Sequence, residues 1–175
     1  VVGGGGTRAI VATAEHLLSA LAGLGIWDAI VEVTGSEIPI LDGSAKDFAE
    51  GLCDWPTRPA MTPIVLTRRV EVRDEKTGAS IVGTPVKGGP GGGRGVYTYH
   101  LDYGVGSAIP PQSALWDGSR ETYLRDIAPA RTFSLESEAQ TARAAGLFRG
   151  FTARDLLVIG ADGRPIENAW RFPDE

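Results

Sequence analysis

Apolar side chains recur every three to four residues near the start of the chain, the spacing of one face of a helix. The positions that follow this spacing are Ala14, Leu17, Leu18, Leu21 and Leu24. They predict a helix over residues 14–24, with Thr13 as its N-cap and Gly23 or Gly25 at its end.

Shorter patterns follow this helix. A β-branched run at residues 29–33 predicts a strand. The turn sequence Asp42-Gly43-Ser44 then predicts a chain reversal that leads into a short helix over residues 45–53. These elements together indicate one α/β unit over residues 1–55.

Three prolines then interrupt every regular pattern. Pro56, Pro59 and Pro63 lie within eight positions of one another, and proline breaks both helices and sheet ladders. We therefore expect a linker over residues 56–62 and a second domain over residues 63–175.

The second domain opens with patterns typical of strands. Strands are expected over residues 64–73, 79–84 and 95–103, with a tight turn at 74–78 between the first two. The sheet is expected to be antiparallel. The glycine-rich stretch 87–95 lacks the Lys-Ser/Thr ending of a phosphate-binding loop and indicates a hairpin loop.

The rest of the domain alternates helical and extended patterns. Helices are expected over residues 120–127 and 137–145, an extended segment over 131–133, and a strand over 156–159. The whole pattern predicts an α+β fold of two-layer α/β sandwich domains, with helices packed on mixed or antiparallel sheets.

Composition narrows the function classes. The 175 residues are 42% hydrophobic and 22% charged, with a formal net charge of −5, which indicates a globular protein and argues against non-specific nucleic-acid binding. No apolar run approaches the roughly 18 residues of a membrane span, so we expect no stable membrane insertion and a cytoplasmic location. The single cysteine, Cys53, rules out an internal disulfide and is expected to be a small core residue.

The pair Glu15-His16 is the first candidate for chemistry. At the start of a helix, the helix dipole favours a charged carboxylate and a neutral imidazole. A neutral histidine can bind zinc, and a carboxylate beside it can act as a general base. The structural alternative is that Glu15 only complements the dipole while His16 lies on a solvated flank, and the local pattern alone favours that alternative.

A different class of function is indicated by the first residues. Gly4-x-Gly6-x-x-Ala9 matches a dinucleotide-binding fingerprint, with Glu32 near the position of a ribose-binding acid. This would be a nicotinamide-dependent oxidoreductase. The helix pattern starts too late for such a motif, and the later strands are expected to be antiparallel rather than parts of further βαβ units.

Two further side chains carry alternatives. His100 lies between tyrosines in a strand pattern, where it is either a second metal ligand or a hydrogen-bonded residue on a polar sheet face. Thr132 is either a hydrogen-bond donor to an oxyanion or an ordinary strand threonine. In both cases the pattern alone favours the structural alternative.

Four separated motifs, taken together and in order, resemble one family. They are residues 13–25, residues 37–45, the sequence Ala130-Arg131-Thr132-Phe133, and the final residues 171–175. In this combination the chain resembles the UDP-3-O-acyl-N-acetylglucosamine deacetylases, zinc-dependent enzymes of lipid A biosynthesis.

The resemblance implies roles for residues of this chain. His16 would be a ligand of Zn²⁺, Glu15 the general base, and Thr132 a donor to the tetrahedral oxyanion. Tyr103 would stack on the uracil of the UDP-linked acylated amino sugar, and the enzyme is expected to be a monomer. Phe133, Leu135 and the segment through Gly150 would line the passage for the acyl chain.

The resemblance also implies missing parts. Family members begin with further strands and continue into a helix that carries the other zinc ligands and a histidine general acid. We therefore expect this chain to be a fragment that is inactive alone and binds zinc poorly. The alternative from another class is a metal-free sugar-nucleotide binding protein that uses the surface of Tyr103 and Phe133.

Overall fold

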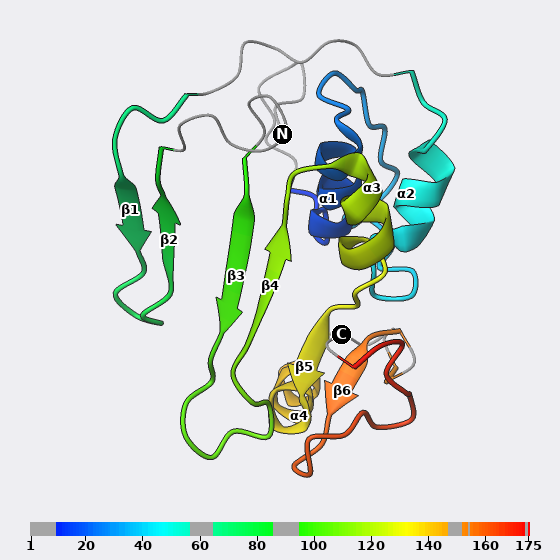
Figure 1. Ribbon diagram of the computed structural model, residues 1–175. Coiled ribbons are helices and arrows are strands. Elements are labelled where there is room, and N and C mark those ends of the chain that lie inside the picture. The colour runs from blue at the N-terminus through cyan, green and yellow to red at the C-terminus, as the bar shows by residue number, and fades with distance from the viewer. Residues whose placement is uncertain (1–9, 57–64, 86–94, 147–151, 154, 174) are drawn as a thin grey trace.

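A computed structural model describes residues 10–56, 65–85, 95–146, 152–153, 155–173 and 175 (Figure 1). The first half of the chain contains α1 (Glu15–Leu24), α2 (Lys46–Leu52), β1 (Val70–Arg73) and β2 (Ser80–Gly83), and β3 (Tyr97–Leu101) follows just after the midpoint. The second half contains β4 (Gln112–Trp116), α3 (Arg120–Thr122), the π-helix η1 (Tyr123–Ile127), β5 (Phe133–Leu135), α4 (Glu136–Ala144) and β6 (Leu157–Ile159).

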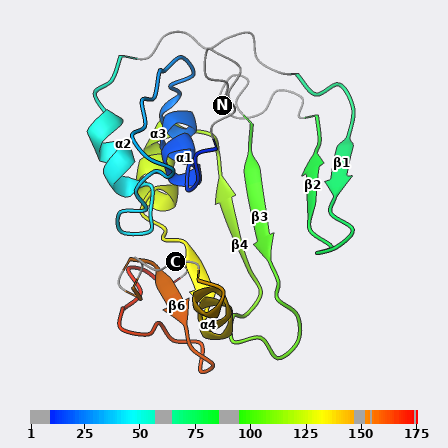
Figure 2. The same ribbon diagram turned by 180° about the vertical axis from the view of Figure 1, so that it is seen from behind.

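The strands form small sheets of two strands each. The β1–β2 and β3–β4 pairs are antiparallel, whereas β5 and β6 are parallel and α4 lies in the crossover between them. Figures 1 and 2 show α1, α2 and α3 on one side of β4, the β1–β2 hairpin on the far side of β3, and β5, β6 and α4 at one end. The predicted α+β class is confirmed.

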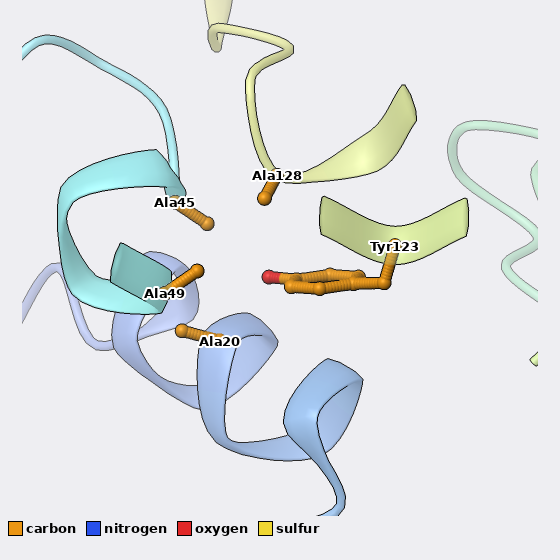
Figure 3. Close-up of a cluster of buried hydrophobic side chains, with 5 residues drawn as sticks. All are labelled: Ala20, Ala45, Ala49, Tyr123 and Ala128. Carbon is orange, nitrogen blue, oxygen red and sulfur yellow. The ribbon is translucent and has the colours of Figure 1, made fainter. Parts of the chain in front are cut away.

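One hydrophobic cluster joins the helices around Tyr123. The ring of this residue is 2% exposed and points at four small residues, as Figure 3 shows: Ala20, Ala45, Ala49 and Ala128. Its hydroxyl lies 2.9 Å from the Ser19 hydroxyl, so the one polar atom of the ring has a partner. Because alanines leave room for a large ring, α1, α2 and η1 pack closely.

A second cluster lies under the parallel pair. Ile109, Leu157 and Ile159 are buried together, and three partly buried side chains pack on them: Leu101, Phe133 and Leu135. The continuous burial of β6 is typical of a parallel strand, which is covered on both faces.

Most of the predicted elements are confirmed, with the residue bounds given above. Helices occur at 14–24, 45–53, 120–127 and 137–145 to within a few residues, and the turn at 74–78 joins β1 to β2. The linker 56–62 lies almost wholly outside the described residues, as does the glycine-rich stretch 87–95, and the domain division stays a prediction.

Three expectations were wrong, and one strand was missed. The later strands do contain a βαβ unit, because β5 and β6 are parallel and α4 lies between them in the chain. Ala14, not Thr13, is the N-cap of α1, and Thr13 has a φ of 57°, so its hydroxyl does not cap the helix. Residues 29–33 form no strand, and among the described residues the pairing nearest to them is a bridge between Ala12 and Glu37. Strand β4 was missed because its residues, Gln-Ser-Ala-Leu-Trp, carry little β-branched signal.

No helix in the described part of the chain is long and apolar enough to cross a lipid bilayer.

Candidate active site

A pocket of about 280 Å³ lies where α1, β5 and α4 approach one another. Its lining includes Glu15, Thr132 and Phe133, three of the residues that the sequence motifs singled out. Thr13, Ile40 and Arg143 are among the other residues that line it. Side chains from motifs far apart in the sequence therefore share one cavity.

Glu15 and His16 begin α1 and have opposite environments. The Glu15 side chain is 70% exposed and faces the pocket, whereas the His16 side chain is 10% exposed. The His16 Nε2 atom lies 3.9 Å from Glu15 Oε1, too far for a hydrogen bond. The structural alternative, a solvated flank for His16, is wrong, because the imidazole is buried.

The buried nitrogen of His16 has no hydrogen-bond partner among the residues that the structure describes. A buried polar atom without a partner costs free energy, so such an atom indicates a bound ligand or a functional role. A nitrogen lone pair without a hydrogen bond is what a metal ligand offers. The donor fits a zinc ion at this position.

A single histidine does not complete a metal site. Over the described residues, no group of three or more His, Cys, Asp and Glu side chains is placed to hold a metal ion. The second histidine, His100, lies on β3, where its Nδ1 atom is 2.7 Å from the Ser113 hydroxyl, in agreement with the polar sheet face.

Thr132 is held by its backbone while its side chain is exposed. Its N–H donates to the Gly43 carbonyl at 2.6 Å, and its carbonyl accepts from the Leu157 N–H at 3.0 Å. The second bond continues the β5–β6 ladder by one residue. The Thr132 side chain lines the pocket beside Glu15.

The predicted substrate-binding residues lie in three different settings. Tyr103 meets Phe133 edge to face, with ring centroids 6.1 Å apart, and burial followed by the charge of Glu138 raises the pKa of the Tyr103 phenol. Leu135 packs in the cluster under β6 rather than on the pocket lining described. Gly150 lies outside the described residues. Cys53, expected in the core, is partly buried at the end of α2.

Sequence reasoning missed a buried ion pair beside the pocket. Arg131 donates from Nε to Glu175 Oε1 at 2.5 Å and from Nη2 to Glu175 Oε2 at 2.7 Å. The remaining donors reach Asn168 Oδ1 at 2.8 Å and the Ala169 carbonyl at 2.7 Å. The two charged side chains are 5% and 0% exposed. Arg131 precedes Thr132 directly, so its place in that motif was the available signal.

A second ion pair joins the same segments. Arg171 binds the Asp42 carboxylate through Nη2 and donates from Nη1 to the Pro129 carbonyl at 2.9 Å. Burial raises the pKa of Asp42, but hydrogen bonds from Ser44 and Arg171 outweigh burial and leave the pKa of this carboxyl below its usual value. Charge at Asp42 is therefore favoured in the folded protein.

The Glu175 carboxyl is shifted in the same direction. Burial raises the pKa of Glu175, but hydrogen bonds from Arg131 and from the Arg171 N–H at 2.8 Å outweigh it, so the pKa of Glu175 is lowered overall. Both ion pairs therefore stay charged around neutral pH, and they tie the Asp42 turn, the Arg131 segment and the chain around Glu175 together.

Comparison with known proteins gives one consistent answer. The sequence model of the UDP-3-O-acyl N-acetylglycosamine deacetylase family matches residues 2–175. The UDP-3-O-acyl-N-acetylglucosamine deacetylase of Synechocystis sp. is 33% identical in an alignment of 175 positions that covers 95% of this chain and 59% of that protein. The enzyme of the same name from Chromobacterium violaceum is 34% identical in an alignment of 171 positions that covers 94% of this chain and 53% of that protein.

The fold and the pocket define a small α+β protein whose candidate site combines a carboxylate, a buried imidazole and a threonine. The chain belongs to the UDP-3-O-acyl N-acetylglycosamine deacetylase family. The resemblance drawn from the four motifs is confirmed. The chain spans 53% to 59% of the length of these two relatives.

Proposed function

We propose that the whole protein is a cytoplasmic, zinc-dependent deacetylase that acts on UDP-3-O-acyl-N-acetylglucosamine in lipid A biosynthesis. Water adds to the acetamide carbonyl, the C–N bond breaks, and acetate and a free amine are released. The observation that carries the proposal is the pocket shared by Glu15 and Thr132 in a chain that matches this family along nearly its whole length.

Glu15 takes the proton of the attacking water in this proposal. Its carboxylate faces the pocket and is well exposed, so it can reach both water and the nitrogen that leaves. Thr132 lies in the same pocket, and its hydroxyl can donate to the oxygen on which negative charge develops. The two groups thus serve the two needs of amide hydrolysis, proton transfer and charge stabilisation.

His16 supplies the chain's ligand for zinc. Its buried Nε2 atom is one donor, and a catalytic zinc site takes three protein ligands. When bound, zinc acts as a Lewis acid that acidifies water and polarises a carbonyl. The other ligands belong to parts of the whole protein beyond the residues described, so residues 1–175 alone are expected to bind zinc weakly and to be inactive.

The nucleotide end of the substrate is assigned to Tyr103. This residue is 45% exposed, so its ring is open for stacking on uracil, and it meets Phe133 edge to face. Phe133 lines the pocket itself. Phe133, Leu135 and Gly150 stay predicted parts of the acyl passage.

The experiment that tests these roles is Glu15→Gln in the whole protein. We expect zinc to stay bound and turnover to fall by about 10² to 10⁴, the usual effect of removing a general base. His16→Ala should lower zinc content as well as turnover. Acetate release and zinc per polypeptide are the two measurements, and Glu50→Gln on the exposed side of α2 is the matched control.

Full turnover in Glu15→Gln would exclude Glu15 as the base. Stoichiometric zinc in residues 1–175 after chelator treatment would contradict the weak binding expected of this part alone. Tight binding of the sugar nucleotide by the whole protein without zinc and without turnover would favour the binding-protein alternative.

A further inference from the structure

The buried charge of Arg131 is the strongest unexplained feature of the chain. Its guanidinium is almost fully buried and donates two hydrogen bonds to the Glu175 carboxylate. It also donates to the Asn168 side chain and to the Ala169 carbonyl. Buried ion pairs are a poor source of stability, since similar apolar packing is often as stable or more so. What such a pair does provide is a fixed geometry, because the planar fork accepts one orientation of the carboxylate.

Arg131 directly precedes Thr132, so the fixed geometry of the ion pair affects the position of Thr132. Neighbouring side chains on extended backbone point to opposite sides. Arg131 points into the ion pair and is buried, while Thr132 is exposed and lines the pocket. Fixing the first side chain therefore fixes the direction of the second.

Both backbone polar groups of Thr132, its N–H and its carbonyl, are hydrogen-bonded. Its N–H is bound to the Gly43 carbonyl and its carbonyl to the Leu157 N–H. A displacement of this stretch of backbone would break these bonds and would also move the Arg131 Cα atom away from the position that the guanidinium contacts require. The side chain and the backbone thus restrain the same motion.

We propose that Arg131 and Glu175 are positioning residues that aim the Thr132 hydroxyl into the pocket beside Glu15. The inference rests on the proposed function, in which Thr132 stabilises the oxyanion. Neither Arg131 nor Glu175 lines the pocket, so both act through Thr132 rather than on the substrate.

The first test is independent of activity. In Arg131→Lys the positive charge stays but the two-pronged contact is lost, so we expect amide hydrogen exchange at Thr132 and Leu157 to quicken by about tenfold, the change for the loss of one charge-assisted hydrogen bond. Amides of α1 should not change. Arg125→Lys is the matched control, since Arg125 makes the same two-pronged contact with Asp126 on the surface.

The second test uses turnover in the whole protein. Arg131→Lys should lower kcat by about tenfold or more with KM nearly unchanged, because a misplaced catalytic group costs rate rather than substrate binding. In a Thr132→Ala background the same substitution should cost nothing further. If Arg131→Lys does not fold, Glu175→Gln, which keeps one oxygen acceptor, replaces it.

The two tests distinguish a positioning role of Arg131 from a general structural role. Equal exchange changes in α1 and at Thr132, or none, would show a general structural role and overturn the proposal. Full additivity with Thr132→Ala would do the same. An inactive wild-type protein would instead refute the proposed deacetylation, while the exchange pattern would still decide whether Arg131 fixes Thr132.

Discussion

At the scale of single residues, His16 carries a stability cost that the proposed zinc ligation would explain. Its Nε2 atom is buried and has no partner in the described part of the chain. The unmet hydrogen bond costs the metal-free protein about 1–3 kcal/mol by the usual penalty for such atoms. A residue selected only for packing at this position would be apolar.

A stability measurement follows from that conflict. In chelator-treated protein, His16→Leu should raise the free energy of unfolding by about 1 kcal/mol, because a buried unpaired nitrogen is replaced by carbon. Denaturant unfolding measures it. The matched control is His100→Leu, which removes an exposed histidine that is bonded to Ser113 and should give no gain.

Adding zinc to the whole protein should make the wild type more stable to unfolding than His16→Leu. The reason is that zinc bound only to the folded wild type stabilises only that protein. A lower stability for metal-free His16→Leu than for the wild type would mean that the imidazole is satisfied in solution.

At the scale of elements, the packing of α1 depends on a glycine, Gly23. Gly23 faces the ring of Tyr123, and a Cβ atom at position 23 would lie 2.4 Å from three ring atoms. The same helix carries Glu15 and His16 at its other end, so the close approach of α1 to η1 also sets where the candidate site lies. Gly25, in the left-handed region at φ 73°, then ends the helix.

Two glycine substitutions separate packing from helix propensity. Gly23→Ala should lower the free energy of unfolding by about 2 kcal/mol, because overpacking displaces the Tyr123 ring. Gly51→Ala in α2 meets no atom within 4 Å and should raise it by about 0.5–1 kcal/mol, the gain of alanine over glycine in a helix. Thermal unfolding compares them. Equal effects would show that ring contact is not the cause.

Elements that form because of their own local sequence pattern were predictable. Elements that need a partner strand to form were not. The spacing of Leu17, Leu21 and Leu24 found α1, because an amphipathic face is a local property. The run at 29–33 looked like a strand but has no ladder to join in the described chain, and β4 forms because β3 supplies one. Thr13 failed as a cap because its backbone is left-handed.

At the scale of the whole molecule, the site is assembled from distant segments. The four motifs found Glu15, His16 and Thr132 from the sequence, but nothing local indicates that Arg131 reaches Glu175, or that Arg171 reaches Asp42. Such pairings depend on the fold bringing the segments together. The sequence could therefore name candidate residues of the site, whose roles stay predictions, but it could not indicate the ion pairs beside them.

The two ion pairs make the free energy of unfolding depend on pH in the acidic range. The pKa values of Glu175 and Asp42 are lowered on folding from 4.5 and 3.8, so the unfolded chain binds more protons as the pH falls through this range. The stabilisation is complete above about pH 5 and is lost as the pH drops through the folded pKa values. The free energy of unfolding should therefore fall steadily below that pH.

Denaturant unfolding between about pH 6 and pH 3 measures the slope. Glu175→Gln should make it shallower, because the buried carboxyl no longer titrates. The control is Asp126→Asn, since an exposed pair with Arg125 contributes little. The same slope in Glu175→Gln as in the wild type would show that this carboxyl does not drive the acid response.

The contact between Arg131 and Glu175 also sets an order of events during synthesis. The two residues are 44 positions apart, so Arg131 leaves the ribosome well before its carboxylate exists outside it. Until Glu175 emerges, the guanidinium lacks the carboxylate that it binds in the folded protein, and burying it without that partner is unfavourable. Translation therefore delivers Thr132 early but delays its final placement, and the pocket is completed only when the segment carrying Glu175 has been made.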